Sequence, residues 1–441
     1  MTSTTPTRTP ATAPAQGPPS PPVPVRHGIR AGWIMMASGW SANQFSALLG
    51  AYRSELGLSE SAVTGLFALY VVGLIPGLLV GGPLADRVGR RPVALTALAL
   101  NLASTLILMC GAASTLLLWP GRFLTGVSAG ALLAAGSAWI KELSSPPYVS
   151  PSTPTTTASR RSGLYVSAGF ATGGLAAALI AQWSPHPMVT AYVPHVLLAA
   201  AAGLAAWACP ETMGPAAPAA AGSRTTAEPA ATAVGRRSAR RNGWAQPTTA
   251  GATNQKHQVT HKFGRTVIPL APWVFAAPAT GFVTLPALVH GNVIYAGVAS
   301  AVVPGTGLLV QPLARRLAKT HRLATAVAAL LTMTVALAAA ALSVAAEQKG
   351  ATLASAAALG AGYGFALTYG LTETTALAPP RQLARRTAHF WTAAYTGMLT
   401  PYAFTLLTHS GGPLTPPALL ALLSALAAVT CGILLTLNRS S

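Results

Sequence analysis

Residues 60–110 read ESAVTGLFALYVVGLIPGLLVGGPLADRVGRRPVALTALALNLASTLILMC. Two apolar runs, 60–81 and 93–114, flank a short stretch in which Asp86, Arg87, Arg90 and Arg91 are charged. A helix of about 20 apolar residues crosses the hydrocarbon core of a bilayer. The pattern therefore predicts two membrane-spanning helices joined by a charged loop at one membrane surface.

The composition of the whole chain points the same way. Of 441 residues, 51% are hydrophobic and only 8% are charged, and the mean hydropathy is +0.49. A soluble domain carries about 25% charged residues. The unbroken Ala, Leu, Val and Gly runs also lack the alternation expected of a β-barrel. A water-soluble enzyme and a wholly disordered chain are excluded, and an all-α polytopic membrane protein is predicted.

Similar apolar runs recur along the chain and predict twelve transmembrane helices. The predicted spans are 30–51, 60–81, 93–114, 117–140, 162–183, 191–209, 266–289, 292–313, 323–345, 352–375, 386–408 and 414–437. A long polar stretch separates the sixth span from the seventh, so we expect two six-helix halves. The expected organisation is a low-complexity, disordered N-terminal tail (1–27), a six-helix bundle (28–209), a cytoplasmic linker (210–263) and a second bundle (264–441).

The basic residues predict how the chain is oriented. With both termini and the linker on one side, 25 of the 28 Lys and Arg residues fall on that side. Arg53 and Lys349 fall on the opposite side, and Arg122 lies near the start of a span. Cytoplasmic loops of membrane proteins carry such an excess. The net charge of +20 is therefore interpreted as a topology signal facing anionic lipid, and nucleic acid is not expected as a partner.

The charged loop carries the most specific pattern. Gly82-Pro-Leu-Ala-Asp86-Arg-Val-Gly89-Arg90-Arg91 resembles the G-x-L-A-D-R-x-G-R-[KR] signature of the major facilitator superfamily, which joins helices 2 and 3. A degenerate copy, Pro312-Leu-Ala-Arg315-Arg316, follows the eighth span. The resemblance implies twelve helices in two halves and a monomeric secondary transporter. It would move a solute by rocker-switch alternating access across the inner membrane of a bacterium.

In this superfamily the loop helps to hold the two halves together. The resemblance implies that Asp86 meets the start of the eleventh helix, here near Arg385–Thr387, and that Arg90 pairs with Glu142. We expect Gly82 to allow close helix approach and Gly89 to allow a tight turn. A simpler alternative is that these charges only set the topology. The latch candidates are Gly82, Asp86, Arg87, Gly89, Arg90, Arg91 and Glu142.

Two further residues are candidates for proton coupling. Arg122-Phe-Leu-Thr-Gly126-Val-Ser-Ala-Gly130 resembles the superfamily motif R-x-x-Q-G-x-x-x-[GA], with Thr125 in place of Gln. The resemblance implies a role for Arg122 in proton transfer. The alternative is that this side chain extends to the outer interface. Gly126 and Gly130 have the spacing that packs membrane helices closely.

Glu373 is the one acid within a predicted span of the second half. A carboxyl inside a membrane is a functional candidate, and this one could load and release a proton. The alternative is an ion pair with Arg381 or Arg385 near the cytoplasmic surface. For Glu211, in Pro210-Glu211-Thr212, a solvated residue at a helix end is expected.

Helices 1, 4, 7 and 10 line the central cavity in the superfamily fold. Polar and aromatic residues of these spans are therefore candidates to bind solute. Hydrogen bonds between helices are an equally good interpretation for the amides, and anchoring at the membrane surface is one for the aromatic residues. The cavity candidates are Trp40, Asn43, Gln44, Tyr363 and Tyr369.

Few charges are available to the cavity, so we expect a small, mostly apolar or weakly polar solute. Export, with protons as the candidate driving ion, is favoured over uptake, although residues 169–174 lack the Gly-Pro pair of the superfamily's antiporter motif. A uniporter or uptake carrier without proton coupling, and a membrane sensor or scaffold that does not transport, stay open. We find no metal cluster, nucleophile triad or phosphate loop in the sequence, so an enzyme, a metal site and a cofactor are not expected.

Overall fold

The computed structural model describes residues 27–149, 155–213, 263–378, 383–408 and 414–439. These residues form helices and short connections. The first part of the chain contains α1 (His27–Ala47), α2 (Leu49–Leu56), α3 (Glu60–Val88), α4 (Arg90–Cys110), η1 (Thr115–Leu117), α5 (Leu118–Ala131), η2 (Leu132–Gly136), α6 (Ser137–Leu143), α7 (Thr155–Trp183), α8 (Pro187–Thr190) and α9 (Val193–Trp207). The second part contains α11 (Trp273–Ala279), η3 (Thr280–Thr284), α12 (Leu285–Leu288), α13 (Val293–Thr320), α14 (Arg322–Ala345), α15 (Lys349–Leu377), α16 (Leu383–Thr396), η5 (Gly397–Leu399), α17 (Thr400–Thr408) and α18 (Pro416–Arg439).

Within the described residues, 9 helices are long and apolar enough to cross a membrane. They correspond to nine of the twelve predicted spans. The other three predicted spans are also helical, in α1, in the shorter apolar helix Trp273–Leu288 and in α16 to α17. The chain is thus a helical, multi-pass membrane protein, and the number twelve stays a prediction. The linker 210–263 lies almost entirely outside the described residues, as does the tail 1–27.

The structure moves one boundary that matters for the site. Helix α3 continues from Glu60 to Val88, seven residues beyond the predicted end of the span. Gly82, Asp86 and Arg87 therefore lie in the last turns of a helix rather than in a loop. The connection to α4 consists of Gly89 alone.

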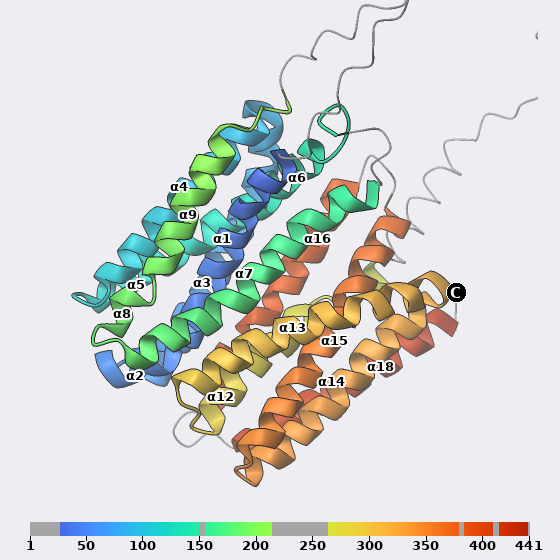
Figure 1. Ribbon diagram of the computed structural model, residues 1–441. Coiled ribbons are helices and arrows are strands. Elements are labelled where there is room, and N and C mark those ends of the chain that lie inside the picture. The colour runs from blue at the N-terminus through green and yellow to red at the C-terminus, as the bar shows by residue number, and fades with distance from the viewer. Residues whose placement is uncertain (1–26, 150–154, 214–262, 379–382, 409–413, 440–441) are drawn as a thin grey trace, which may run out of the picture.

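The helices of the two parts of the chain occupy opposite sides of the bundle (Figure 1). In the first part, α1 packs against α7 and α9, and α3 packs against α5. In the second part, α15 packs against both α13 and α14. Helices α7 and α13 lie side by side between the two parts, and α3 contacts α16 and α17.

Two ends of the bundle are named for use below. The linker end is the end at which Gly89, Leu143 and Trp207 lie, where the first part of the chain leads into the linker. The far end is the opposite one, at which Gly57 and Asn292 lie.

Glycines bring α3 and α5 into backbone contact. A Cβ atom at Gly126 would collide with the carbonyl oxygen of Tyr70, and one at Gly130 with that of Leu74. The predicted packing role of both glycines is confirmed. For Gly82 the expectation is wrong, because a Cβ there would stay 3.8 Å from Ala134. Gly81, one residue earlier, makes the close approach instead.

Replacing Gly126 by Ala is expected to destabilise the bundle. Because the obstacle is backbone, α3 and α5 must separate, which costs about 1–3 kcal/mol. The matched control is Gly432→Ala in α18, where nothing lies within 4 Å of the added Cβ. That change should be neutral or stabilising by up to about 1 kcal/mol. Thermal unfolding of the purified protein in detergent measures both, and equal midpoints would contradict the packing argument.

Candidate functional site

The turn between α3 and α4 is built on a single glycine. Gly89 is buried and adopts φ 116°, a conformation that side-chain-bearing residues avoid. The same residue ends α3 and begins α4. The glycine thus fixes where the charged residues on either side of the turn lie.

Arg90 connects three segments at the linker end. Its guanidinium lies 2.6 Å from a carboxylate oxygen of Asp86 and 3.4 Å from one of Glu142. Arg90 and Glu142 therefore lie together as the sequence analysis expected. Asp86, in the last turn of α3, pairs with Arg90 at the start of α4, and the side chain of Asp86 is 59% exposed. Arg87 is exposed, and the side chain of Arg385 lies outside the described residues.

Glu211 forms hydrogen bonds that were not predicted from the sequence. Its carboxylate accepts hydrogen bonds from the backbone N–H groups of Arg90 (3.0 Å) and Arg91 (2.9 Å), at the start of α4. Unpaired N–H groups and the helix dipole favour an anion at this position. The expectation of a solvated glutamate is wrong, because Glu211 caps a helix that lies more than a hundred residues earlier in the chain.

Other contacts strengthen the same junction. Thr212 donates its hydroxyl hydrogen to the second carboxylate oxygen of Glu142. Arg91 donates to the carbonyl oxygen of Trp207 at 2.7 Å, and its guanidinium lies 5.3 Å from the centre of that indole ring. The segment after α9 is thus joined to the start of α4 and to the end of α6.

Arg122 is buried among aromatic rings. Its side chain is 0% exposed, and its guanidinium carbon lies 4.1 Å from the ring centre of Phe45 and 4.9 Å from that of Tyr70. Its Nε donates to the carbonyl oxygen of Leu66 at 3.3 Å. The alternative of a side chain that extends to the membrane surface is therefore wrong.

The charge of Arg122 is not compensated by any described carboxylate. None of the ion pairs formed by the described residues includes it, and its two terminal nitrogens have no hydrogen-bond partner there. The phenols of Tyr52 and Tyr192 are hydrogen-bonded to each other, and the Tyr52 ring centre lies 4.9 Å from that of Phe45, which faces Arg122. Rings that face a cation stabilise it, but less than a carboxylate does.

A polar network that the sequence analysis did not identify lies inside the first part of the bundle. The amide of Asn101 donates to the hydroxyls of Ser41 (3.0 Å) and Ser128 (2.9 Å). Thr125, which stands where the superfamily motif has Gln, donates to Ser104 at 3.1 Å. All five side chains are buried. Asn101 is the one side-chain amide in the predicted span 93–114, and only that feature could have indicated it.

Asn43 joins the two parts of the chain. Its side-chain amide donates to the backbone oxygens of Phe170 in α7 (2.6 Å) and Ser300 in α13 (3.0 Å). Of the two interpretations left open for this residue, the structure has the hydrogen bond between helices. Gln44 is fully buried, and neither polar atom of its amide has a partner among the described residues. Trp40 is half-buried.

An aromatic cluster in the second part includes one of the cavity candidates. Phe275 stacks on Tyr395 with ring centres 4.4 Å apart, and it lies 6.1 Å from Tyr363 and 6.2 Å from Trp391. These rings come from α11, α15 and α16. Tyr369 is instead buried and donates to the carbonyl oxygen of Thr266 at 3.4 Å.

The rings of this cluster are partly accessible and carry polar groups. Phe275, Tyr363 and Trp391 are half-buried. Phe275, Trp391 and Tyr395 were not among the predicted cavity residues, because the order of residues along separate helices does not reveal which rings meet. Helix α16, which carries Trp391 and Tyr395, contacts α3, the helix of Tyr70. The cluster therefore faces the first part of the chain.

Glu373 forms an ion pair at 3.7 Å with Arg322, the first residue of α14. The expected alternatives, Arg381 and Arg385, have side chains outside the described residues. Glu373 is 8% exposed and Arg322 is largely solvated. The carboxylate therefore lies where the inside of the bundle meets the linker end.

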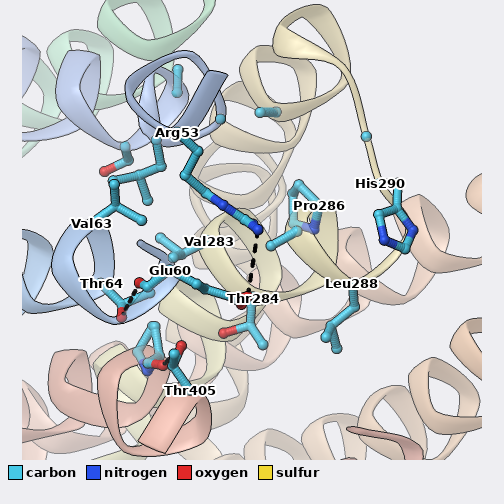
Figure 2. Close-up of a pocket in the computed structure, with 18 of the residues that line it drawn as sticks. Arg53, Glu60, Val63, Thr64, Val283, Thr284, Pro286, Leu288, His290 and Thr405 are labelled. Carbon is cyan, nitrogen blue, oxygen red and sulfur yellow. Dashed lines mark hydrogen bonds and ion pairs between the residues drawn. The ribbon is translucent and has the colours of Figure 1, made fainter. Parts of the chain in front are cut away.

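A cavity of about 490 Å³ lies at the far end of the bundle. Its walls come from α1, α2 and α3 on one side and from η3, α12, α13 and α17 on the other. Figure 2 shows Arg53 extending over Glu60, with an ion-pair distance of 3.7 Å. The predicted cavity residues Trp40, Asn43, Gln44, Tyr363 and Tyr369 are not among the residues that line it.

Within the described residues, no group of three or more His, Cys, Asp or Glu side chains is placed to hold a metal ion.

The fold defines a polytopic helical membrane protein in which a single glycine joins two charged helix ends. The model of the Major Facilitator Superfamily matches residues 31–285, which is more than half of the chain. The chain belongs to the Major Facilitator Superfamily.

Individual relatives match less of the chain. Multidrug resistance protein MdtL of Escherichia coli O139:H28 is 34% identical over 89 residues, which are 20% of this chain and 22% of MdtL. The matching segment thus spans about a fifth of that relative's length.

Solved structures share the fold over nearly the whole chain. A POT family transporter in complex with a thioalcohol-conjugated peptide has a TM-score of 0.71 at 12% identity, with 94% of this chain and 96% of that chain covered. The xylose transporter XylE from E. coli, in a partially occluded inward-open conformation, has a TM-score of 0.64 at 14% identity. The two structures match over 93% of this chain and 97% of XylE.

The capping role of Glu211 predicts a pH dependence. Partial burial by itself raises the pKa of the Glu211 carboxyl, but hydrogen bonds from the backbone N–H groups of Met213, Arg91, Arg90 and Thr212 outweigh burial and hold the pKa below its ordinary value. A lowered pKa stabilises the folded state fully above the pKa of the unfolded state, which is about 4.3. This contribution is lost as the pH falls through the folded-state pKa.

The thermal midpoint of the protein should therefore fall more steeply on acidification below about pH 5 than that of Glu211→Gln. Glu55→Gln, at an exposed position of the far end, is the control and should follow the unmodified protein. Parallel curves for the unmodified protein and Glu211→Gln would show that this carboxylate does not cap α4.

Proposed function

We propose that the chain is a secondary active transporter that moves a small, mostly apolar or weakly polar solute across the cytoplasmic membrane of a bacterium. It does so by alternating access, with two six-helix halves (28–209 and 264–441) joined by a cytoplasmic linker (210–263). Both termini and the linker end face the cytoplasm, and the far end faces outward. The excess of basic residues on the linker side supports this orientation.

The observation that carries the proposal is the contact between α7 and α13. These two long helices pack against each other although they belong to different halves. Asn43 donates to a backbone oxygen of each of them. The Asn43 amide, which is hydrogen-bonded to both halves, is suited to a pivot. Rocking of the halves about the contact between α7 and α13 would leave its two hydrogen bonds nearly unchanged. Membership of a transporter superfamily agrees with this arrangement.

The aromatic cluster supports the solute class. Four rings from three helices provide stacking surface, and two phenols and one indole provide hydrogen-bonding groups. None of the ion pairs of the described residues lies in this cluster. Sites of this kind suit solutes that are largely apolar with few polar groups. Export as the direction is supported by the name of the MdtL relative.

The junction at the linker end is proposed as the conformational latch. Arg90 holds Asp86 and Glu142, and Glu211 holds the backbone of the same turn. Gly82, Arg87, Gly89 and Arg91 complete the segment. Asp86 remains exposed on one side, so it can exchange Arg90 for the start of α16 when the halves close at this end.

Arg122 and Glu373 are proposed for proton coupling. Arg122 carries a buried, uncompensated charge, which makes its surroundings sensitive to the charge of a solute or a proton nearby. Glu373 has one loosely placed partner, Arg322. Protons, a small-molecule solute and membrane lipids are the proposed partners of a monomeric protein.

The role of the aromatic cluster can be tested by transport of Nile red, an uncharged planar aromatic dye. Trp391→Leu removes a stacking surface and should slow efflux from energised cells about twofold to tenfold. The control is Trp183→Leu at a residue that is 73% exposed, which should leave efflux unchanged. Efflux equal to that of cells without the protein, for every solute tried, would support a sensor or scaffold instead.

Proton coupling can be tested in proteoliposomes with an imposed pH gradient. Glu373→Gln should abolish gradient-driven flux of the dye but keep its exchange at equal pH on both sides, because binding and alternation remain. Asp86→Asn should slow both. Flux that still follows the gradient in Glu373→Gln would show that this carboxyl does not couple, and a carrier without any gradient dependence would be a uniporter.

A further inference from the structure

Two buried hydroxyl groups in the wall of the far-end cavity have unsatisfied hydrogen-bonding capacity. Ser46 in α1 is 3% exposed and Thr284 in η3 is 6% exposed, and both line the cavity. Neither hydroxyl has a hydrogen-bond partner among the described residues. A hydroxyl buried without a partner is costly. These two groups are therefore suited to a partner that enters the cavity.

Other hydroxyls of the same cavity are already satisfied. Thr64 donates to the carbonyl oxygen of Glu60 at 2.8 Å, and Thr405 donates to that of Pro401 at 3.0 Å. Asn292 accepts a hydrogen bond from the backbone N–H of Tyr295 at 2.9 Å. The lack of partners thus distinguishes Ser46 and Thr284 within one cavity.

The two hydroxyls come from different halves of the chain. Ser46 belongs to the first half and Thr284 to the second. Figure 2 shows Thr284 beside Glu60 and Arg53, with Val283, Pro286 and Leu288 around the same space. A molecule that fills the cavity contacts both halves at once.

The charges around the cavity define the chemistry of its occupant. Arg53 and Glu60 face each other, so they supply no net charge. Much of the remaining wall is apolar, including Val63, Phe282 and Phe404. A charged head group beside Ser46 and Thr284 would lose its hydration and would have to break the existing Arg53–Glu60 pair to gain a counter-ion. An alcohol, ketone or amide group can instead bond to both hydroxyls.

We infer that this cavity is a second binding site, for uncharged amphipathic molecules, in which Ser46 and Thr284 bind the polar group and the apolar wall binds the body. Its outward orientation rests on the proposed function. A volume of about 490 Å³ is within the range of small-molecule sites, about 300–1,000 Å³. The site is separate from the aromatic cluster, since no ring of that cluster lines it.

Photoaffinity labelling tests the inference. The full chain in lipid nanodiscs is irradiated with 3-azioctanol, an uncharged diazirine alcohol, and labelled peptides are located by mass spectrometry. Saturable labelling is expected within 46–64 and 282–293, which line the cavity. A diazirine probe of equal chain length with a trimethylammonium head should not label them. Labelling that does not saturate, or that is equal for both probes, overturns the inference.

Matched variants assign the polar contacts. Ser46→Ala and Thr284→Val should each weaken binding and raise the half-saturating concentration of 3-azioctanol about threefold to tenfold. Thr284→Ser keeps a hydroxyl and should restore binding. Thr405→Val is the control, because its hydroxyl already has a partner in the protein. An equal loss in Thr405→Val, or none in Thr284→Val, would contradict the assignment.

The labelling needs no gradient and no flux, so it is independent of transport. Saturable, head-group-selective labelling without efflux of any solute tried, Nile red included, would contradict the proposed function and leave the second site. Efflux without such labelling would contradict the second site and leave the proposed function.

Discussion

The bilayer imposes the constraint on which this structure depends. Lipid offers no hydrogen bonds to the backbone and little hydrophobic drive between helices, so a bundle must cohere through close packing. This chain meets the requirement with glycines that place backbones in contact. Gly126 faces the carbonyl of Tyr70, Gly169 that of Met36, and Gly364 that of Gly307. These contacts rigidify α3 with α5, α1 with α7, and α13 with α15. Rigid pairs of this kind can move as bodies, which alternating access requires.

Because the dielectric constant inside the membrane is low, the energy of each internal charge depends strongly on its nearest partners. At the linker end, Arg90 has two carboxylates and the start of α4 has Glu211, so the junction is strongly bonded yet close to water. Inside the bundle, Arg122 has aromatic rings and a single carbonyl. An internal charge without a counter-ion is costly, and such charges are kept where they act. The contrast places the paired charges of the junction near the surface and the uncompensated charge of Arg122 in the interior.

Hydropathy predicts most of the fold, because nine of the twelve predicted spans correspond to apolar helices of membrane length among the described residues. The span at 266–289 is shorter and contains the π-type segment Thr280–Thr284, which residue composition does not reveal. The glycine of the signature around Asp86 predicted the tight turn. The family resemblance that this signature carries implied the Arg90–Glu142 contact. For Arg122 the sequence left an interior and an interfacial position open, and capping by Glu211 was missed, because both depend on tertiary neighbours. For the same reason Phe275, Trp391 and Tyr395 were not candidates.

In the proposed transport cycle the two halves rock about the contact of α7 with α13, so that one end closes as the other opens. Distances between spin labels measure this directly in nanodiscs. One pair is placed at Glu55 and Glu347 at the far end, and the other at Lys141 and Lys319 at the linker end, all at exposed positions. When a transported solute is added or the pH is lowered, the account predicts that one distance increases while the other decreases. Two distances that change in the same direction, or that stay fixed while flux continues, would contradict it.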